Sequence, residues 1–136
     1  VDDARSRGQR VGLVKVKTYR PFPVQAVAKA LNGLKAVGVV DRSVSFGWNS
    51  GPLFQDVIGA LQFASKRPPA MSFIGGLAGA DITIDHFGRV IERVQALAQD
   101  GQVAGDGRAM RPRTRAPGKL TVDNPVEALH HDLRRP

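Results

Sequence analysis

The sequence predicts an α/β fold, a three-layer sandwich with helices on both faces of a sheet. Three short segments are mostly apolar, without a regular alternation of apolar and polar positions, which is typical of strands that are buried on both faces. Between them lie segments whose apolar residues recur every three or four positions, the spacing of an amphipathic helix. With 136 residues, 42% of them hydrophobic and 24% charged, the chain has the size and composition of one globular domain.

The first eight residues have the pattern of the last turns of a helix, with Gly8 at the position of a left-handed C-cap. Residues 11–16 follow; they are rich in valine and are bounded by Pro21 on their far side, which predicts a buried strand. Because three strands are few for a sheet covered on both faces, we expect that the first strand of the domain precedes residue 1. We therefore expect the chain to be part of a longer protein.

A helix is predicted to follow Pro23, because the fixed φ of proline suits the first turn of a helix. From residue 24 the apolar side chains recur three, four and seven positions apart, and the pattern stops at Asn32. Residues 36–40 are then apolar without a break, which predicts a second strand that ends at Asp41.

The alternation of helix and strand continues to residue 101. Pro52 favours a second helix that begins there, and residues 70–74 form the third predicted strand. A glycine-rich loop follows this strand, and Thr83 is the predicted N-cap of the last helix. The inward faces expected for these two helices are Leu53, Phe54, Val57, Ile58 and Leu61 in the first, and Phe87, Val90, Ile91, Val94 and Leu97 in the second.

The sequence divides into a domain at residues 1–103 and a basic, proline-rich extension at residues 104–136. The extension has 7 basic and 4 acidic residues, and the whole chain has a net charge of +8. A nucleic-acid-binding module is one interpretation of this surplus. However, the most basic run, residues 108–119, has no aromatic residue on which bases could stack, so we expect it to be solvated or docked on a partner.

Several classes of protein are excluded by composition. The chain has no cysteine, which excludes disulfides, zinc sites built on cysteine and iron–sulfur clusters held by its own thiolates. No apolar run reaches 18 residues, so no membrane-spanning helix is predicted. The N-terminus has no apolar stretch of the signal-peptide kind, and we expect a cytoplasmic protein without a membrane partner.

The candidate site consists of polar residues at the ends of two predicted strands. Arg20 follows the first strand, and Asp41 and Arg42 end the second. The carboxyl ends of parallel strands meet at the edge where α/β sheets present their ligand sites, and two guanidinium groups there can hold a carboxylate or phosphate. Alternatively, Asp41 pairs with an arginine and fixes its loop. We treat these three residues as candidates for a cleft or an interface, and we predict no catalytic, cofactor-binding or metal-binding residue.

Three motifs occur in the order and with the spacing of a known family. They are Tyr19-Arg20-Pro21-Phe22-Pro23, the stretch 41–54 that begins Asp-Arg-Ser and ends Gly-Pro-Leu-Phe, and the stretch 73–83 that contains Gly-Gly-Leu-Ala-Gly-Ala-Asp. Together they resemble the C-terminal part of the alpha subunit of pyruvate:ferredoxin oxidoreductases (pyruvate synthases) and related 2-oxoacid oxidoreductases, over about residues 1–100. The family often has arginine where Ala80 stands, so any contact made by that arginine is absent here.

The resemblance implies a fold like the transketolase C-terminal domain, with a five-stranded mixed sheet and a strand and most of a helix ahead of Val1. It also implies a structural, interface-forming domain of an enzyme that oxidatively decarboxylates a 2-oxoacid to an acyl-CoA. The Arg-Pro-Phe-Pro motif favours the pyruvate branch. The implied partners are subunits of the beta, gamma and delta type, with ferredoxin and coenzyme A serving the whole complex. The chain alone is expected to be inactive.

Thiamine diphosphate, Mg and [4Fe-4S] clusters are implied elsewhere in such a complex, and none is expected on this chain. Gly105-Asp106-Gly107 is similar to the start of the thiamine diphosphate magnesium motif, but the next asparagine, Asn124, comes too soon, so we interpret the triplet as a loop. The equivalent domain of a transketolase, or of the E1 beta chain of a 2-oxoacid dehydrogenase, is the alternative within the same fold.

Overall fold

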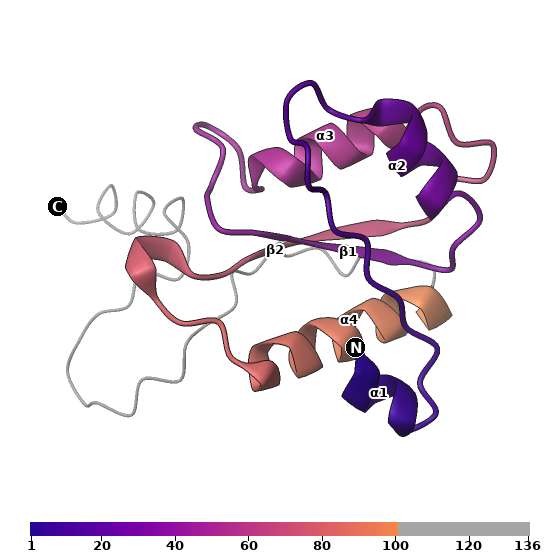
Figure 1. Cartoon of the computed structure of the whole chain (residues 1–136), viewed down its shortest axis with the longest axis vertical. Helices are drawn as coiled ribbons and strands as arrows, with labels where there is room; N and C mark the ends of the chain where they lie inside the picture. Colours follow the sequence, from indigo (N-terminus) through magenta and orange to yellow (C-terminus); the bar gives the residue numbers. More distant parts are fainter. Residues whose placement is uncertain (101–136) are drawn as a thin grey trace, which may run out of the picture.

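A computed structural model gives the structure of the chain, and it describes residues 1–100 (Figure 1). The elements in chain order are α1 (Asp2–Ser6), α2 (Val24–Leu31), β1 (Val37–Asp41), α3 (Pro52–Leu61), β2 (Ala70–Ile74), the 3-10 turn η1 (Leu77–Gly79) and α4 (Ile84–Asp100). The two strands pair in parallel, with Val37 opposite Ala70 and Asp41 opposite Ile74. The predicted α/β class is confirmed at this level.

Helices cover both faces of the small sheet (Figure 1). On one face, α2 and α3 pack on β1 through a buried cluster that includes Leu31, Val39 and Val57. On the other face, α4 packs on the sheet through Phe73, Val90 and their neighbours. Since both strands are covered, almost every residue of β2 is buried, Ser72 included, as its mostly apolar composition predicts.

The predicted helices and the second and third strands all form, with ends within about two residues of their expected positions. Gly8 has a φ of +79°, the left-handed conformation expected of a C-cap. The predicted inward face of α3 is confirmed, since Val57 and Leu61 are buried and the other three residues pack against the same cluster. In α4, Val90 and Leu97 are buried and Val94 packs beside them.

Phe87 corrects the predicted core face of α4, because its side chain is 45% exposed. It lies in the first turn of the helix, and no buried cluster of the described residues includes it. The helical spacing places Phe87 on the same face as Val90, but the part of α4 that packs on the sheet begins only at Val90.

The strand predicted at residues 11–16 is wrong for the described structure. This segment runs from α1 to α2 in extended form without joining the sheet, and Leu13 is 62% exposed (Figure 1). Only Val16 packs against the core. A strand needs a hydrogen-bonded neighbour, and in residues 1–100 the two strands pair with each other alone. The expectation of a further strand ahead of residue 1 stays a prediction.

The extension at residues 104–136, with its basic run and the Gly105-Asp106-Gly107 triplet, lies outside the described residues, and the domain boundary stays a prediction. Within residues 1–100, no helix combines the length and the hydrophobicity that crossing a bilayer requires.

Candidate functional site

Asp41 ends β1 and holds the start of α3. Its side chain is buried, and the two carboxylate oxygens accept hydrogen bonds from the backbone N–H groups of Leu53 (2.9 Å) and Phe54 (3.1 Å). The first N–H groups of a helix have no partner within the helix, and the N-cap residue Gly51 has no side chain to supply one. Asp41 therefore caps α3 from the neighbouring strand, which ties the loop after β1 to the sheet.

Burial raises the pKa of Asp41, because a desolvated carboxylate is less stable than the acid. The two N–H groups of α3 oppose this shift, and the nearby charge of Asp56 adds to it. One expectation from the sequence is that Asp41 pairs with an arginine. In the structure its hydrogen-bond partners are backbone N–H groups instead.

Arg20 lies on the outer side of α3. Its Nη1 donates to Asp56 Oδ2 at 2.9 Å and to the carbonyl of Tyr19 at 2.8 Å. The guanidinium carbon stands 4.1 Å from the centre of the Tyr19 ring, a cation–π contact. The hydrogen bond to Asp56 raises the pKa of Arg20. The pKa of Tyr19 is also raised, mainly by burial and then by the Asp56 carboxylate. Arg20 thus anchors the segment before α2 to α3.

Arg42 lies against the loop that follows β2. A Cβ added to Gly76 would stand 2.9 Å from Arg42 Nε, so the side chain crosses closely over this backbone. Arg42 is exposed, and among residues 1–100 its guanidinium has no carboxylate partner. The structure therefore keeps Asp41 and Arg42 at the carboxyl edge of the sheet, whereas Arg20 is engaged with Asp56. A role for the three residues in a cleft or interface stays a prediction.

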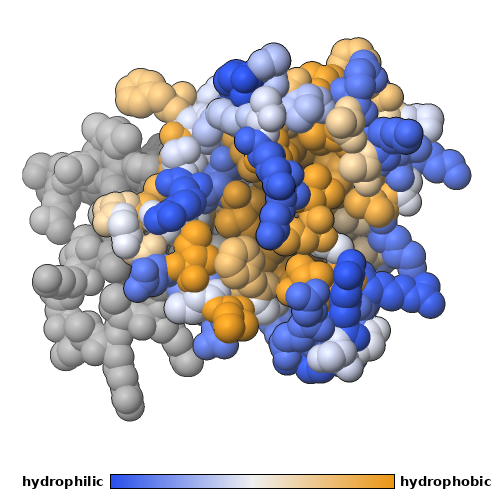
Figure 2. Space-filling model, viewed as in Figure 1, coloured by the Kyte–Doolittle hydropathy of each residue, from blue (hydrophilic) through white to orange (hydrophobic). Residues whose placement is uncertain are grey.

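Exposed apolar side chains gather at the same edge, and they were not predicted from the sequence. They come from the loop after β1, from η1 after β2, and from the first turn of α4. We call this group the carboxyl-edge patch; it consists of Val44, Phe46, Trp48, Leu77, Ile84 and Phe87. In Figure 2, hydrophobic side chains interspersed with polar ones are visible over these loops. Two aromatic residues in a loop otherwise rich in serine and glycine were the signal in the sequence.

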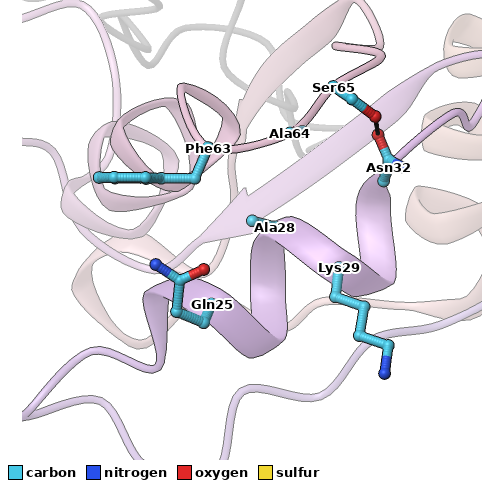
Figure 3. Close-up of a pocket in the computed structure, with 7 residues that line it drawn as sticks. All are labelled: Gln25, Ala28, Lys29, Asn32, Phe63, Ala64 and Ser65. Carbon is cyan, nitrogen blue, oxygen red and sulfur yellow. Dashed lines mark hydrogen bonds between the residues drawn. The ribbon is translucent and has the colours of Figure 1, made fainter.

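A second surface feature lies at the opposite edge of the sheet. A shallow pocket of about 200 Å³ opens between α2 and the segment that follows α3 (Figure 3). Its lining residues are Gln25, Ala28, Lys29, Asn32, Phe63, Ala64 and Ser65. Asn32 Oδ1 accepts hydrogen bonds from Ser65 Oγ (3.2 Å) and the N–H of Lys66 (2.9 Å), which joins the two segments. The lining has no pairing of a nucleophile with a base, so we assign the pocket no chemistry.

The described residues do not fit a metal or an iron–sulfur cluster. Within residues 1–100 no three His, Cys, Asp or Glu side chains lie close enough to hold a metal ion. The buried carboxylate, Asp41, is already occupied by the N–H groups of Leu53 and Phe54. Thiolate ligands are absent from the sequence altogether.

Comparison with known proteins gives the family. Residues 1–87 match the family model described as pyruvate:ferredoxin oxidoreductase core domain II. The chain is 54% identical over 104 residues to the alpha subunit of an NADH-dependent phenylglyoxylate dehydrogenase from Aromatoleum evansii, which is 76% of this chain and 25% of that protein. It is 41% identical over 92 residues to pyruvate synthase subunit PorA of Thermotoga maritima, covering 68% of this chain and 23% of that protein.

A third relative, pyruvate synthase subunit PorA of Methanosarcina barkeri, is 35% identical over 101 residues, or 74% of this chain and 25% of that protein. The chain thus spans about a quarter of the length of these relatives. The family match extends from α1 to the first turn of α4 and includes the whole carboxyl edge. With 87 of its 136 residues matched, the chain belongs to the pyruvate:ferredoxin oxidoreductase core domain II family.

Proposed function

We propose that this chain is a domain of the alpha subunit of a 2-oxoacid oxidoreductase and that its role there is structural. The observation that carries the proposal is the 54% identity over 104 residues to an alpha subunit of this class. The described residues support a structural role, because their one buried carboxylate is used to fix a helix and no catalytic arrangement accompanies it. The chain positions neighbouring parts of the enzyme and is inactive by itself.

The complete domain is a three-layer α/β/α sandwich of the transketolase C-terminal type. Helices on both faces of the described sheet support this proposal (Figure 1). So does the segment at residues 11–16, which is extended, apolar and exposed at Leu13 and Val14, as a strand without its neighbours would be.

The reaction proposed for the whole enzyme is the oxidative decarboxylation of a 2-oxoacid to an acyl-CoA. The bond between the carboxylate and carbonyl carbons breaks, a thioester bond forms, and carbon dioxide, one proton and two electrons leave. Thiamine diphosphate supplies the electron sink for such a decarboxylation when bound, and clusters on other chains carry the electrons. Both are proposed to lie outside residues 1–100, on other domains and on subunits of the beta, gamma and delta type.

Two substrates have support. The Arg20-Pro21-Phe22-Pro23 motif favours pyruvate, with ferredoxin as the electron acceptor. The relative with 54% identity is named for phenylglyoxylate and NADH, which favours an aromatic 2-oxoacid and a nicotinamide acceptor. Both substrates share the 2-oxo carboxylate that reacts, so the class of reaction is the same.

The test is a native pull-down of the full chain from its source. The eluate is assayed for thiamine diphosphate, for iron, and for viologen reduction with pyruvate, 2-oxoisovalerate and phenylglyoxylate in turn. We expect both cofactors and reduction with one of these acids. Thiamine diphosphate without iron would contradict the proposal in favour of a transketolase or E1 enzyme. Nucleic acid without either cofactor would contradict it in favour of a role for the basic extension.

A further inference from the structure

The carboxyl-edge patch is a concentration of exposed apolar surface. Of the twelve large hydrophobic residues that are exposed within residues 1–100, six belong to the patch. Phe46 is fully exposed, Ile84 is 82% exposed and Trp48 is 67% exposed. Exposed apolar patches that are rimmed by polar residues commonly mark surfaces that bind another molecule.

The patch rests on loops with defined conformations. In the loop after β1, the N–H of Ser45 donates to the carbonyl of Ser50 at 2.9 Å, and the N–H of Trp48 donates to the carbonyl of Ser45 at 3.0 Å. The N–H of Gly75 donates to the carbonyl of Asp41 at 2.9 Å, which joins the loop after β2 to the end of β1. A surface held in place before binding loses less conformational entropy when a partner docks.

The start of α4 is held in the same way. The N–H of His86 donates to Thr83 Oγ1 at 3.4 Å, and the N–H of Thr83 donates to His86 Nδ1 at 3.0 Å, a reciprocal cap of the helix. Ile84 and Phe87, the two patch residues of this turn, are therefore presented on a capped helix.

The composition of this edge fits a protein partner. Tryptophan, phenylalanine and arginine are enriched in the centres of protein–protein interfaces. Arg42 lies among the patch loops, close over Gly76, and no carboxylate of the described residues pairs with it. A partner surface that is apolar and offers one carboxylate to Arg42 would complement this edge in both shape and charge.

The length of the relatives indicates which partner. The region matched in the phenylglyoxylate dehydrogenase alpha subunit is 25% of that protein, so three quarters of such a subunit lies outside it. We propose that the carboxyl-edge patch is the surface on which this remaining part of the alpha subunit packs, with a carboxylate of that part bound to Arg42. The inference rests on the proposed function, which supplies the partner.

Cysteine footprinting of the assembled complex tests the proposal, since the chain has no cysteine of its own. Asn49→Cys places a thiol beside Trp48, and the control Lys35→Cys places one beside Leu34, an exposed apolar residue at the opposite edge of the sheet. Alkylation of each position is followed by mass spectrometry of its peptide, in the complex and in urea.

Because an interface excludes the reagent, we expect alkylation at Asn49→Cys to be at least about tenfold slower in the complex than in urea. At Lys35→Cys the two alkylation rates should differ by less than about twofold. Both comparisons are corrected for intrinsic thiol reactivity. A photo-crosslinker on Asn49→Cys should join it to peptides of the alpha subunit outside the matched region. Equal protection at both positions, or none at either, would overturn the proposal.

Crosslinks to a second copy of this chain, or to another subunit, would overturn the proposed partner. The 2-oxoacid-dependent viologen reduction of the same preparations is measured separately. Activity without protection would refute the patch proposal alone. Protection with alpha-subunit crosslinks but without activity on any 2-oxoacid would refute the proposed reaction alone.

Discussion

Gly51 lies so close to Asp41 that a Cβ added at position 51 would overlap with the carboxyl carbon of Asp41. This contact occurs where Asp41 accepts the N–H groups of Leu53 and Phe54. A residue with a side chain at the helix N-cap would fill the space that the carboxylate needs. The absence of a side chain at residue 51 thus allows a strand residue to cap α3.

Replacing Gly51 tests this relationship. We expect Gly51→Ala to lower the free energy of unfolding of the full chain by about 1–3 kcal/mol, because the methyl group overpacks against Asp41. Gly59→Ala is the matched control in the same helix, where an added Cβ meets nothing within 4 Å. There alanine should stabilise the chain by about 0.5–1 kcal/mol through its higher helix propensity. Urea unfolding followed by circular dichroism measures both, and equal effects would contradict the prediction.

Removing the capping carboxylate should also cost stability. Asp41→Ala leaves the N–H groups of Leu53 and Phe54 without their acceptor, and we expect a loss of about 1–3 kcal/mol in the free energy of unfolding. Asp56→Ala is the control, since its ion pair with Arg20 is open to solvent on the Arg20 side, which is 60% exposed, and surface pairs contribute about 0–1 kcal/mol. The same urea experiment compares them. A larger loss in the Asp56 variant would show that the cap is not the main contribution.

Stability should depend on pH through Asp41. Its pKa is raised above the ordinary 3.8 in the folded chain, so the folded state holds this proton more tightly than the unfolded state does. The stabilisation that this group adds to the free energy of unfolding is therefore complete below pH 3.8. It is lost as the pH rises through the raised pKa of the folded state. We expect the stability of the wild type relative to Asp41→Asn to be greater at about pH 3 than at about pH 6. A difference that grows with pH would reverse the sign and refute the assignment.

Arg42 is expected to act in assembly. In the assembled enzyme, Arg42→Ala should weaken the docking of this edge, which Asn49→Cys alkylation would report as at least about a threefold loss of protection. Lys29→Ala, an exposed cation on α2 away from the patch, should leave the protection unchanged. If Arg42→Ala changes neither assembly nor turnover, the predicted role of Arg42 in an interface is wrong.

The local elements could be predicted from the order of residues alone. Helical spacing, Pro52 at a helix start and short, mostly apolar runs placed α2, β1, α3, β2 and α4, because these signals act between residues close in the chain. The ordered motifs also indicated the family that the comparison then showed.

Contacts between residues far apart in the chain depend instead on how the elements pack. Residues 11–16 have the composition of a strand but no partner in the described chain, and strand formation depends on that partner. Arg20 pairs with Asp56, 36 positions away, and Asp41 binds backbone N–H groups of α3 rather than an arginine. The exposure of Phe46 and Trp48 likewise depends on what packs around their loop. No spacing in the sequence reports such contacts, because they arise only when the elements pack together.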